Sequence, residues 1–375
     1  MAQQLSGLCE FIVGQYKIFK TDRVNICETN WKNDIALFKG KDVAQWKKGE
    51  GEDWRAKTFI KWAKVKVFAA YAVICDVYFQ GGKIPFVLSE SPYGKHIKEI
   101  LTGFISDEEV KQFQEQEKRG IQQMTDKIHE QLGDRDAIKQ YMRKILSLAI
   151  YGEAWSKFNV EDVLREYYEP IIAGTEFEGV MPEIVGFDPR VDTEEVPGWE
   201  YRSVWDMFYD MSNEDIQKGG GIIERDFISA YELRKLKGQP FYIDDYIDTI
   251  LASYNRDQAS EGSNEDEAQE RPGKRSLYKR QDNIRRLEFW GRAPRHLVEQ
   301  FEKDIQNKVS LDVIQVGQSI GDQDKAGDDV EIMAQIVKTP TFEAIIRFAR
   351  NDGKRPYCHG LWEEQLDETI GYGIV

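Results

Sequence analysis

Histidine and cysteine are the side chains most often used to bind metal or to act as nucleophiles, and in this chain they are scattered. The four histidines show neither His-Glu-x-x-His nor another paired spacing: they are His96, His129, His296 and His359. Only Cys358 and His359 are adjacent, and two neighbouring ligands cannot build a tetrahedral site alone. The sequence therefore predicts no metal site, with a metal held at Cys358-His359 as the minor alternative.

The cysteines also show no disulfide or zinc-ribbon framework. No Cys-x-x-Cys pair occurs among the four, which are Cys9, Cys27, Cys75 and Cys358. We expect free thiols in a reducing compartment.

Two glycine-rich segments lack the patterns of phosphate- and nucleotide-binding loops. Residues 218–221 (Lys-Gly-Gly-Gly) do not match Gly-x-x-x-x-Gly-Lys-Ser/Thr, and a turn before a strand explains them. Gly371 and Gly373 lack the third glycine and following helix of a dinucleotide fingerprint. No Gly-x-Ser-x-Gly elbow occurs. We predict that the chain is not an enzyme and needs no cofactor.

Charged side chains are abundant but form no convincing site. Acidic pairs such as Asp206 with Asp210 are more simply solvated, because a catalytic pair needs two distinct environments. The basic cluster at residues 292–296 is a single short stretch. The formal net charge of −15 argues against a protein that grips duplex DNA or an acidic membrane surface.

Composition and length predict a folded chain. Hydrophobic residues make up 41% and charged residues 31% of 375 residues, enough for one large domain or two ordinary ones. The N-terminus has no signal-peptide pattern, and the apolar run at residues 67–75 is far shorter than the roughly 20 residues of a membrane span.

The first half of the sequence predicts helices. Residues 54–79 form a Pro- and Gly-free run that ends at Gly81-Gly82, and its lysines (Lys57, Lys61 and Lys64) are expected to be solvated. A capping box at residues 106–109 opens a second helix, which Gly133-Asp134 breaks. A third helix is predicted over residues 137–151.

After Gly152 the pattern changes to strands. Strands are predicted at residues 199–206, 222–227, 286–290, 311–316, 331–337 and 342–348. A capping box at Ser229 to Glu232 opens a short helix closed by Gly238. The sequence thus predicts an α+β fold with long N-terminal helices followed by a mostly antiparallel sheet.

Four consecutive segments are predicted from these changes in pattern. They are a helical part (1–152), an α/β part (153–255), a mobile acidic loop (256–275) and antiparallel strands (276–375).

Several short motifs recur in an order that resembles one family. They are Trp54-Arg55 before a long helix, Tyr151-Gly152 before a strand, Asp188-Pro189 at a strand end, Ser229 to Leu233 as a turn of helix, Glu288 to Gly291 (with Trp290) as a strand, Arg347 near Asn351-Asp352, the Pro356-Tyr357 segment, and Gly371 to Ile374. This order resembles the portal, or head–tail connector, protein of tailed bacteriophages. Each motif is short, and their order along the chain carries the resemblance.

The resemblance implies a structural role. In that family these positions shape the outer wing of a subunit, and copies assemble, typically as a twelve-membered ring, around a DNA channel at the capsid vertex. The implied partners are further copies of the chain, the terminase, the capsid or scaffold protein, a tail adaptor, and double-stranded DNA that passes without sequence-specific binding. The implied location is the virion, after assembly in the host cytoplasm.

One departure and two alternatives accompany the resemblance. Family members continue into stem, clip and often crown regions, and this sequence ends where the first stem helix is expected. The alternatives are another virion or scaffold-binding structural protein and, less favoured, a metal-dependent hydrolase.

Overall fold

The computed structural model confirms the α+β class. It describes residues 6–40, 61–79, 82, 84, 86, 88, 89, 107–172, 184–213, 215–239, 241–254, 283–306, 329–339, 342–351, 354–363, 373 and 374. Two compact units interleave along the chain: unit 1 comprises Met1–Tyr71, Ile145–Trp155 and Arg202–Val375, and unit 2 comprises Ala72–Lys144 and Ser156–Tyr201. The four consecutive segments predicted from the sequence stay a prediction.

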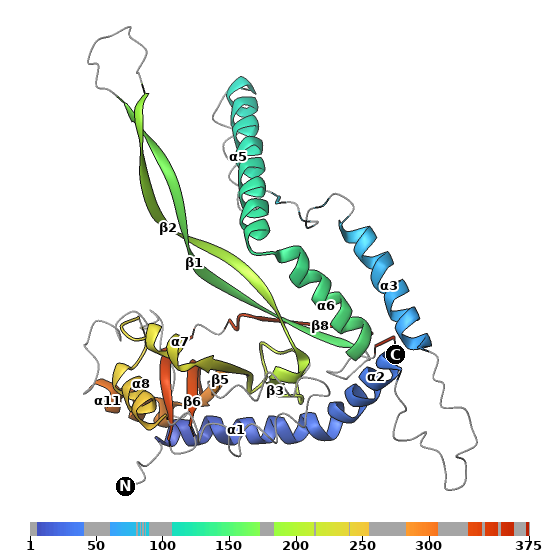
Figure 1. Cartoon of the computed structure of the whole chain (residues 1–375), viewed down its shortest axis with the longest axis vertical. Coiled ribbons are helices and arrows are strands. Elements are labelled where there is room, and N and C mark those ends of the chain that lie inside the picture. Colours follow the sequence, from blue (N-terminus) through green and yellow to red (C-terminus); the bar gives the residue numbers. More distant parts are fainter. Residues whose placement is uncertain are drawn as a thin grey trace. The chain divides into compact units, whose positions relative to one another are not determined.

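Unit 1 is built on a five-stranded antiparallel sheet with the strand order β3-β4-β5-β6-β7 (Figure 1). These strands are β3 (Met207–Tyr209), β4 (Gly221–Ser229), β5 (Asn283–Pro294), β6 (Asp329–Lys338) and β7 (Glu343–Arg350). The helices of unit 1 are α1 (Gly7–Arg23), a π-helix (Val24–Glu28), α2 (Thr29–Lys39), α7 (Ala230–Lys235), α8 (Asp244–Ser253) and α11 (Arg295–Gln306).

Helices cover both faces of this sheet. On one face, α1 and α11 share a core with alternate residues of β5 and β6, such as Phe289 and Ala334. On the other face, α7 and α8 pack with Ile284 and Val337. Unit 1 therefore has three layers, with the antiparallel sheet between two layers of helices.

Local sequence explains why α1 forms and which side it buries. The hydroxyl of Ser6 caps the helix by accepting from the Cys9 N–H at 3.3 Å. Buried residues then recur every three or four positions, at Leu8, Ile12, Tyr16, Phe19 and Arg23.

Besides β2 (Ile184–Arg202), whose last residue lies in unit 1, three described elements run from one unit into the other. They are α3 (Trp62–Phe79), α6 (Ala137–Tyr151) and β1 (Glu153–Ile172). Unit 2 also contains α5 (Asp107–Asp134) and most of β2. β1 lies between β2 and β8 (Tyr357–Leu361) in a three-stranded sheet.

Several described elements match the sequence prediction, whereas α1, α2, α8, α11, β3 and β8 were not individually predicted. Helix α6 has the predicted bounds. Strands β4, β5 and β6 contain three of the predicted strands, β7 covers all but Phe342 of a fourth, and the four are paired in sequence order. Ser229 and Glu232 form the predicted capping box at α7. The predicted strand at 311–316, the acidic loop at 256–275, the capping serine at 106, Trp54, Arg55, Lys57 and Gly371 lie outside the described residues.

Three local predictions were wrong. Asp188-Pro189 lies inside β2 instead of ending a strand; β2 is an edge strand, and an edge position tolerates the missing N–H of proline. The break after α5 falls at Arg135-Asp136, where Asp136 has φ 50°, since Gly133 remains helical. The strand expected over 199–206 ends at Arg202, and Val204–Asp206 is a 3-10 turn.

Two further differences concern the start of a helix and the length of two strands. Helix α3 begins at Trp62, and Lys61 before it is not helical. The length of β1 and β2, 20 and 19 residues, was not foreseen. In the described part of the chain, no helix is both long and apolar enough to span a membrane.

Candidate functional site

The positions that carry the family resemblance fall in both units. Tyr151, Gly152, Trp290, Gly291 and Gly373 lie in unit 1, whereas Asp188 and Pro189 are exposed on β2 in unit 2. Trp54, Arg55 and Gly371 lie outside the described residues.

In unit 1, Gly152 and Gly373 meet where α6 ends and β1 begins. Gly152 has φ 81° and donates its N–H to Leu148 O at 2.9 Å, which terminates the helix. A Cβ on Gly373 would lie 2.7 Å from Ile150 O and 3.0 Å from Gly152 N. Glycine at 373 is thus required for this close backbone approach.

Hydrogen bonds hold the same junction together. The Ile374 N–H donates to Ala149 O at 3.0 Å, and the Trp362 N–H donates to Gly152 O at 2.8 Å. Residues 149–152 are more than 200 positions from Trp362 and Ile374, so this junction is a tertiary feature.

Tyr151 and Trp290 both pack against one aromatic cluster of unit 1. Trp31 and Trp205 form its centre, with ring centroids 5.3 Å apart in an edge-to-face arrangement. The Tyr151 ring lies 6.2 Å from Trp205 and 6.3 Å from Trp31. The cluster therefore connects the end of α6 with strand β5.

Gly291 makes the second close backbone approach. A Cβ at this position would lie 2.5 Å from both Gly220 O and the Gly221 Cα on the neighbouring strand. The Arg292 N–H donates to Gly220 O at 3.0 Å. As predicted, the glycine-rich stretch at 218–221 forms a turn that leads into β4.

A buried polar group lies beside the junction. Glu153 is fully buried, and its Oε2 accepts from the Tyr209 hydroxyl at 3.2 Å and lies 2.9 Å from His359 Nε2. The His359 ring stacks on Trp155 with centroids 4.3 Å apart. Burial, together with the charge of Glu153, raises the pKa of Tyr209 well above its usual value.

This geometry argues against a shared Cys358-His359 metal site. Cys358 is exposed, whereas His359 turns inward to Glu153, as neighbouring strand residues do. No group of three His, Cys, Asp or Glu side chains suited to a metal ion occurs among the residues that the structure describes.

Two more buried carboxylates lie on the five-stranded sheet: Glu224 bonds to residues of β8 and β2, and Glu288 bonds within the sheet. Glu224 accepts from the Tyr357 hydroxyl at 2.7 Å and pairs with Arg202 at 2.7 Å. Glu288 accepts from Trp290 Nε1 at 2.7 Å and from Gln335 Nε2 at 2.9 Å. Desolvation and the charge of Glu224 raise the pKa of Tyr357 well above its usual value.

Arg355 anchors the segment before β8. Its fully buried guanidinium pairs with Glu331 at 2.7 Å and donates to Gly219 O at 2.6 Å and to Ile216 O. A buried arginine that is fully hydrogen-bonded fixes the neighbouring backbone.

The acidic and basic clusters considered in the sequence have structural contacts. Burial disfavours the charge of Asp210, but hydrogen bonds from Ser212, Gly220 and Asn213 outweigh it and lower the pKa of this carboxyl. Arg292 lies 3.8 Å from Glu331.

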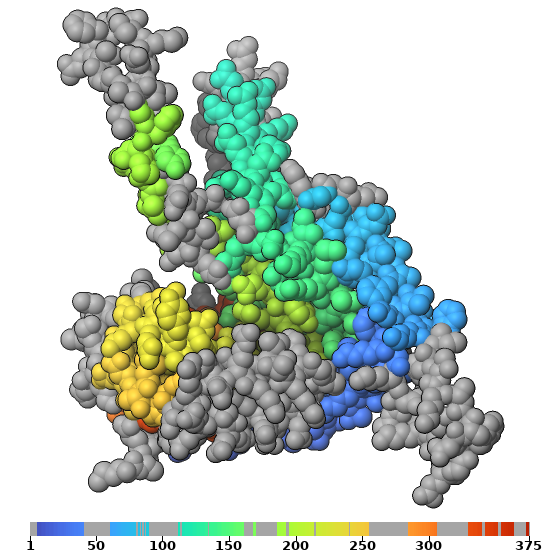
Figure 2. Space-filling view, viewed as in Figure 1, coloured from blue at the N-terminus to red at the C-terminus, as the bar shows by residue number. Residues whose placement is uncertain are grey.

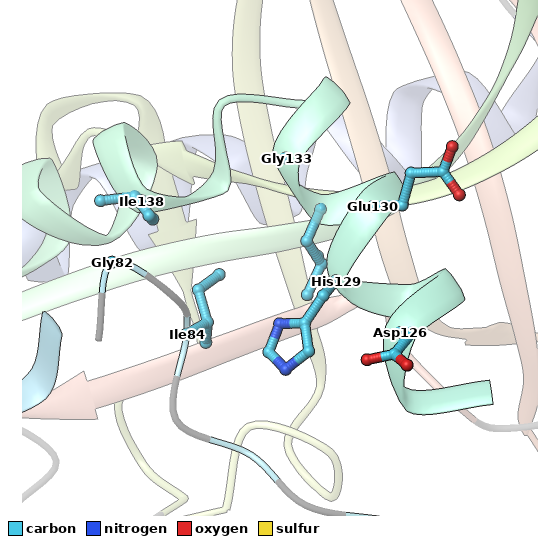
Figure 3. Close-up of a pocket in the computed structure, with 8 residues that line it drawn as sticks. Gly82, Ile84, Asp126, His129, Glu130, Gly133 and Ile138 are labelled. Atoms are coloured by element: carbon cyan, nitrogen blue, oxygen red, sulfur yellow. The ribbon is translucent and has the colours of Figure 1, made fainter. Parts of the chain in front are cut away.

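Unit 2 has a pocket of about 430 Å³ between α5, the start of α6 and residues near Gly82. Figure 3 shows His129 beside Ile84, with Asp126 and Glu130 on the same helix. The His129 ring lies 4.3 Å from Phe86. This pocket is open and combines one imidazole with two helix carboxylates, without a converging set of donors.

No family model matches the chain, and no curated protein matches it.

The polar groups at the junction were not foreseen from the sequence. Glu153 and His359 are 206 positions apart, and neither has a local spacing that signals a pair. The resemblance had singled out Tyr151-Gly152 and Gly373. In the structure, Gly373 lies against the backbone of Ile150 and Gly152.

Proposed function

We propose that this chain forms the wing of a portal subunit of a tailed bacteriophage. In this proposal, copies build a ring at the capsid vertex through which viral DNA is packaged and ejected. The chain has a structural role, and no residue is assigned to catalysis or cofactor binding.

One observation carries the proposal: three of the motifs that resemble the family converge in unit 1. Tyr151-Gly152, Trp290-Gly291 and Gly373-Ile374 are separated by long stretches of sequence. They lie around one aromatic cluster and one backbone junction. The closeness of these three motifs in space supports a shared structural role for them.

The proposed partners follow from the role. Further copies of the chain form the ring, and the terminase, the capsid or scaffold protein and a tail adaptor bind its faces. DNA passes through without sequence-specific contacts, for which a net charge of −15 is suitable because few phosphates would be neutralised.

The mass of the purified chain in solution tests the proposal. Light scattering at several concentrations, with negative-stain images of the same samples, should show closed rings of roughly twelve 43.6-kDa chains. A closed dimer, or a chain that remains monomeric at every concentration, would contradict the ring role.

A further inference from the structure

We draw no further inference here: the strongest candidate, the exposed apolar side of α3 that includes Trp62, Val73 and Val77 and that Figure 2 shows in blue at the surface, carries nothing because the described part of the structure does not show what covers it.

Discussion

Single glycines allow the closest backbone contacts of unit 1. At Gly291 the neighbouring strand occupies the place of a side chain, and at Gly373 the last turn of α6 does so. Neither contact is with a flexible side chain that could move away. Gly291 and Gly373 are therefore required by packing, whichever function the chain performs.

Replacement of Gly291 by alanine should destabilise unit 1. The new methyl would lie 2.5 Å from the Gly221 Cα, so the strands must separate, at a cost of about 2–4 kcal/mol. Urea unfolding measures the loss. Gly14→Ala is the matched control, since nothing lies within 4 Å of its added methyl, and there alanine should stabilise α1 by about 0.5–1 kcal/mol. Equal effects of the two changes would contradict the packing argument.

Asp34 on α2 should make stability depend on pH. Burial raises the pKa of this carboxyl from 3.8 to about 6. Well below pH 3.8 the side chain is protonated in both states and costs nothing. Between pH 4 and 6 the unfolded chain ionises first, so the fold loses stability as the pH rises.

At pH 7.5 the variant Asp34→Asn should therefore unfold at a higher urea concentration than the original chain. We expect a gain of roughly 1–2 kcal/mol there, after allowance for partial exposure, and at most about 0.5 kcal/mol at pH 4. Urea titrations at both pH values measure the difference. Asp188→Asn, at an exposed position on β2, is the matched control. A gain at pH 4 as large as that at pH 7.5 would contradict the assignment to burial.

At the scale of elements, the sequence predicted those helices and strands whose formation depends on residues close together in the chain. Helix α6 and the capping box at Ser229 were found because their apolar spacing and their caps lie within a few residues. The paired length of β1 and β2 was missed because polar and proline residues interrupt their alternation. The Glu153–His359 contact was missed because only tertiary folding brings residues 206 positions apart together.

The cap of α7 gives a prediction at this scale. Ser229 accepts from the Glu232 N–H at 3.2 Å, and Glu232 accepts in return from the Ser229 N–H at 2.9 Å. Ser229→Ala should cost about 1 kcal/mol of unfolding free energy, whereas Ser229→Thr retains the hydroxyl and most of the stability.

A second readout separates the cap from general packing. Hydrogen bonds from the Ser229 backbone and hydroxyl lower the pKa of Glu232. In Ser229→Ala the hydroxyl bond is lost, so this pKa should rise, as carboxyl NMR shifts during titration would show. An unchanged pKa would contradict a capping box in solution.

At the scale of the whole molecule, net charge distinguishes a protein that lets DNA slide past from one that binds DNA tightly. Acidic residues number 66 against 51 basic ones, so the chain has few cations to spare for phosphates. Each phosphate that a protein neutralises releases counterions, and binding then weakens steeply as salt rises. A subunit through whose ring DNA slides should lack this strong electrostatic attraction.

We therefore expect the full chain to bind duplex DNA only weakly. Fluorescence anisotropy with a labelled duplex of about 30 base pairs, at 150 mM salt, should show no saturation below about 10⁻⁴ M, the weak end of non-specific binding. Two duplexes of unrelated sequence should behave alike, because no contact reads the bases. Micromolar binding with a steep salt slope would instead require a basic surface that holds DNA in place, and such a grip would oppose passage through a channel.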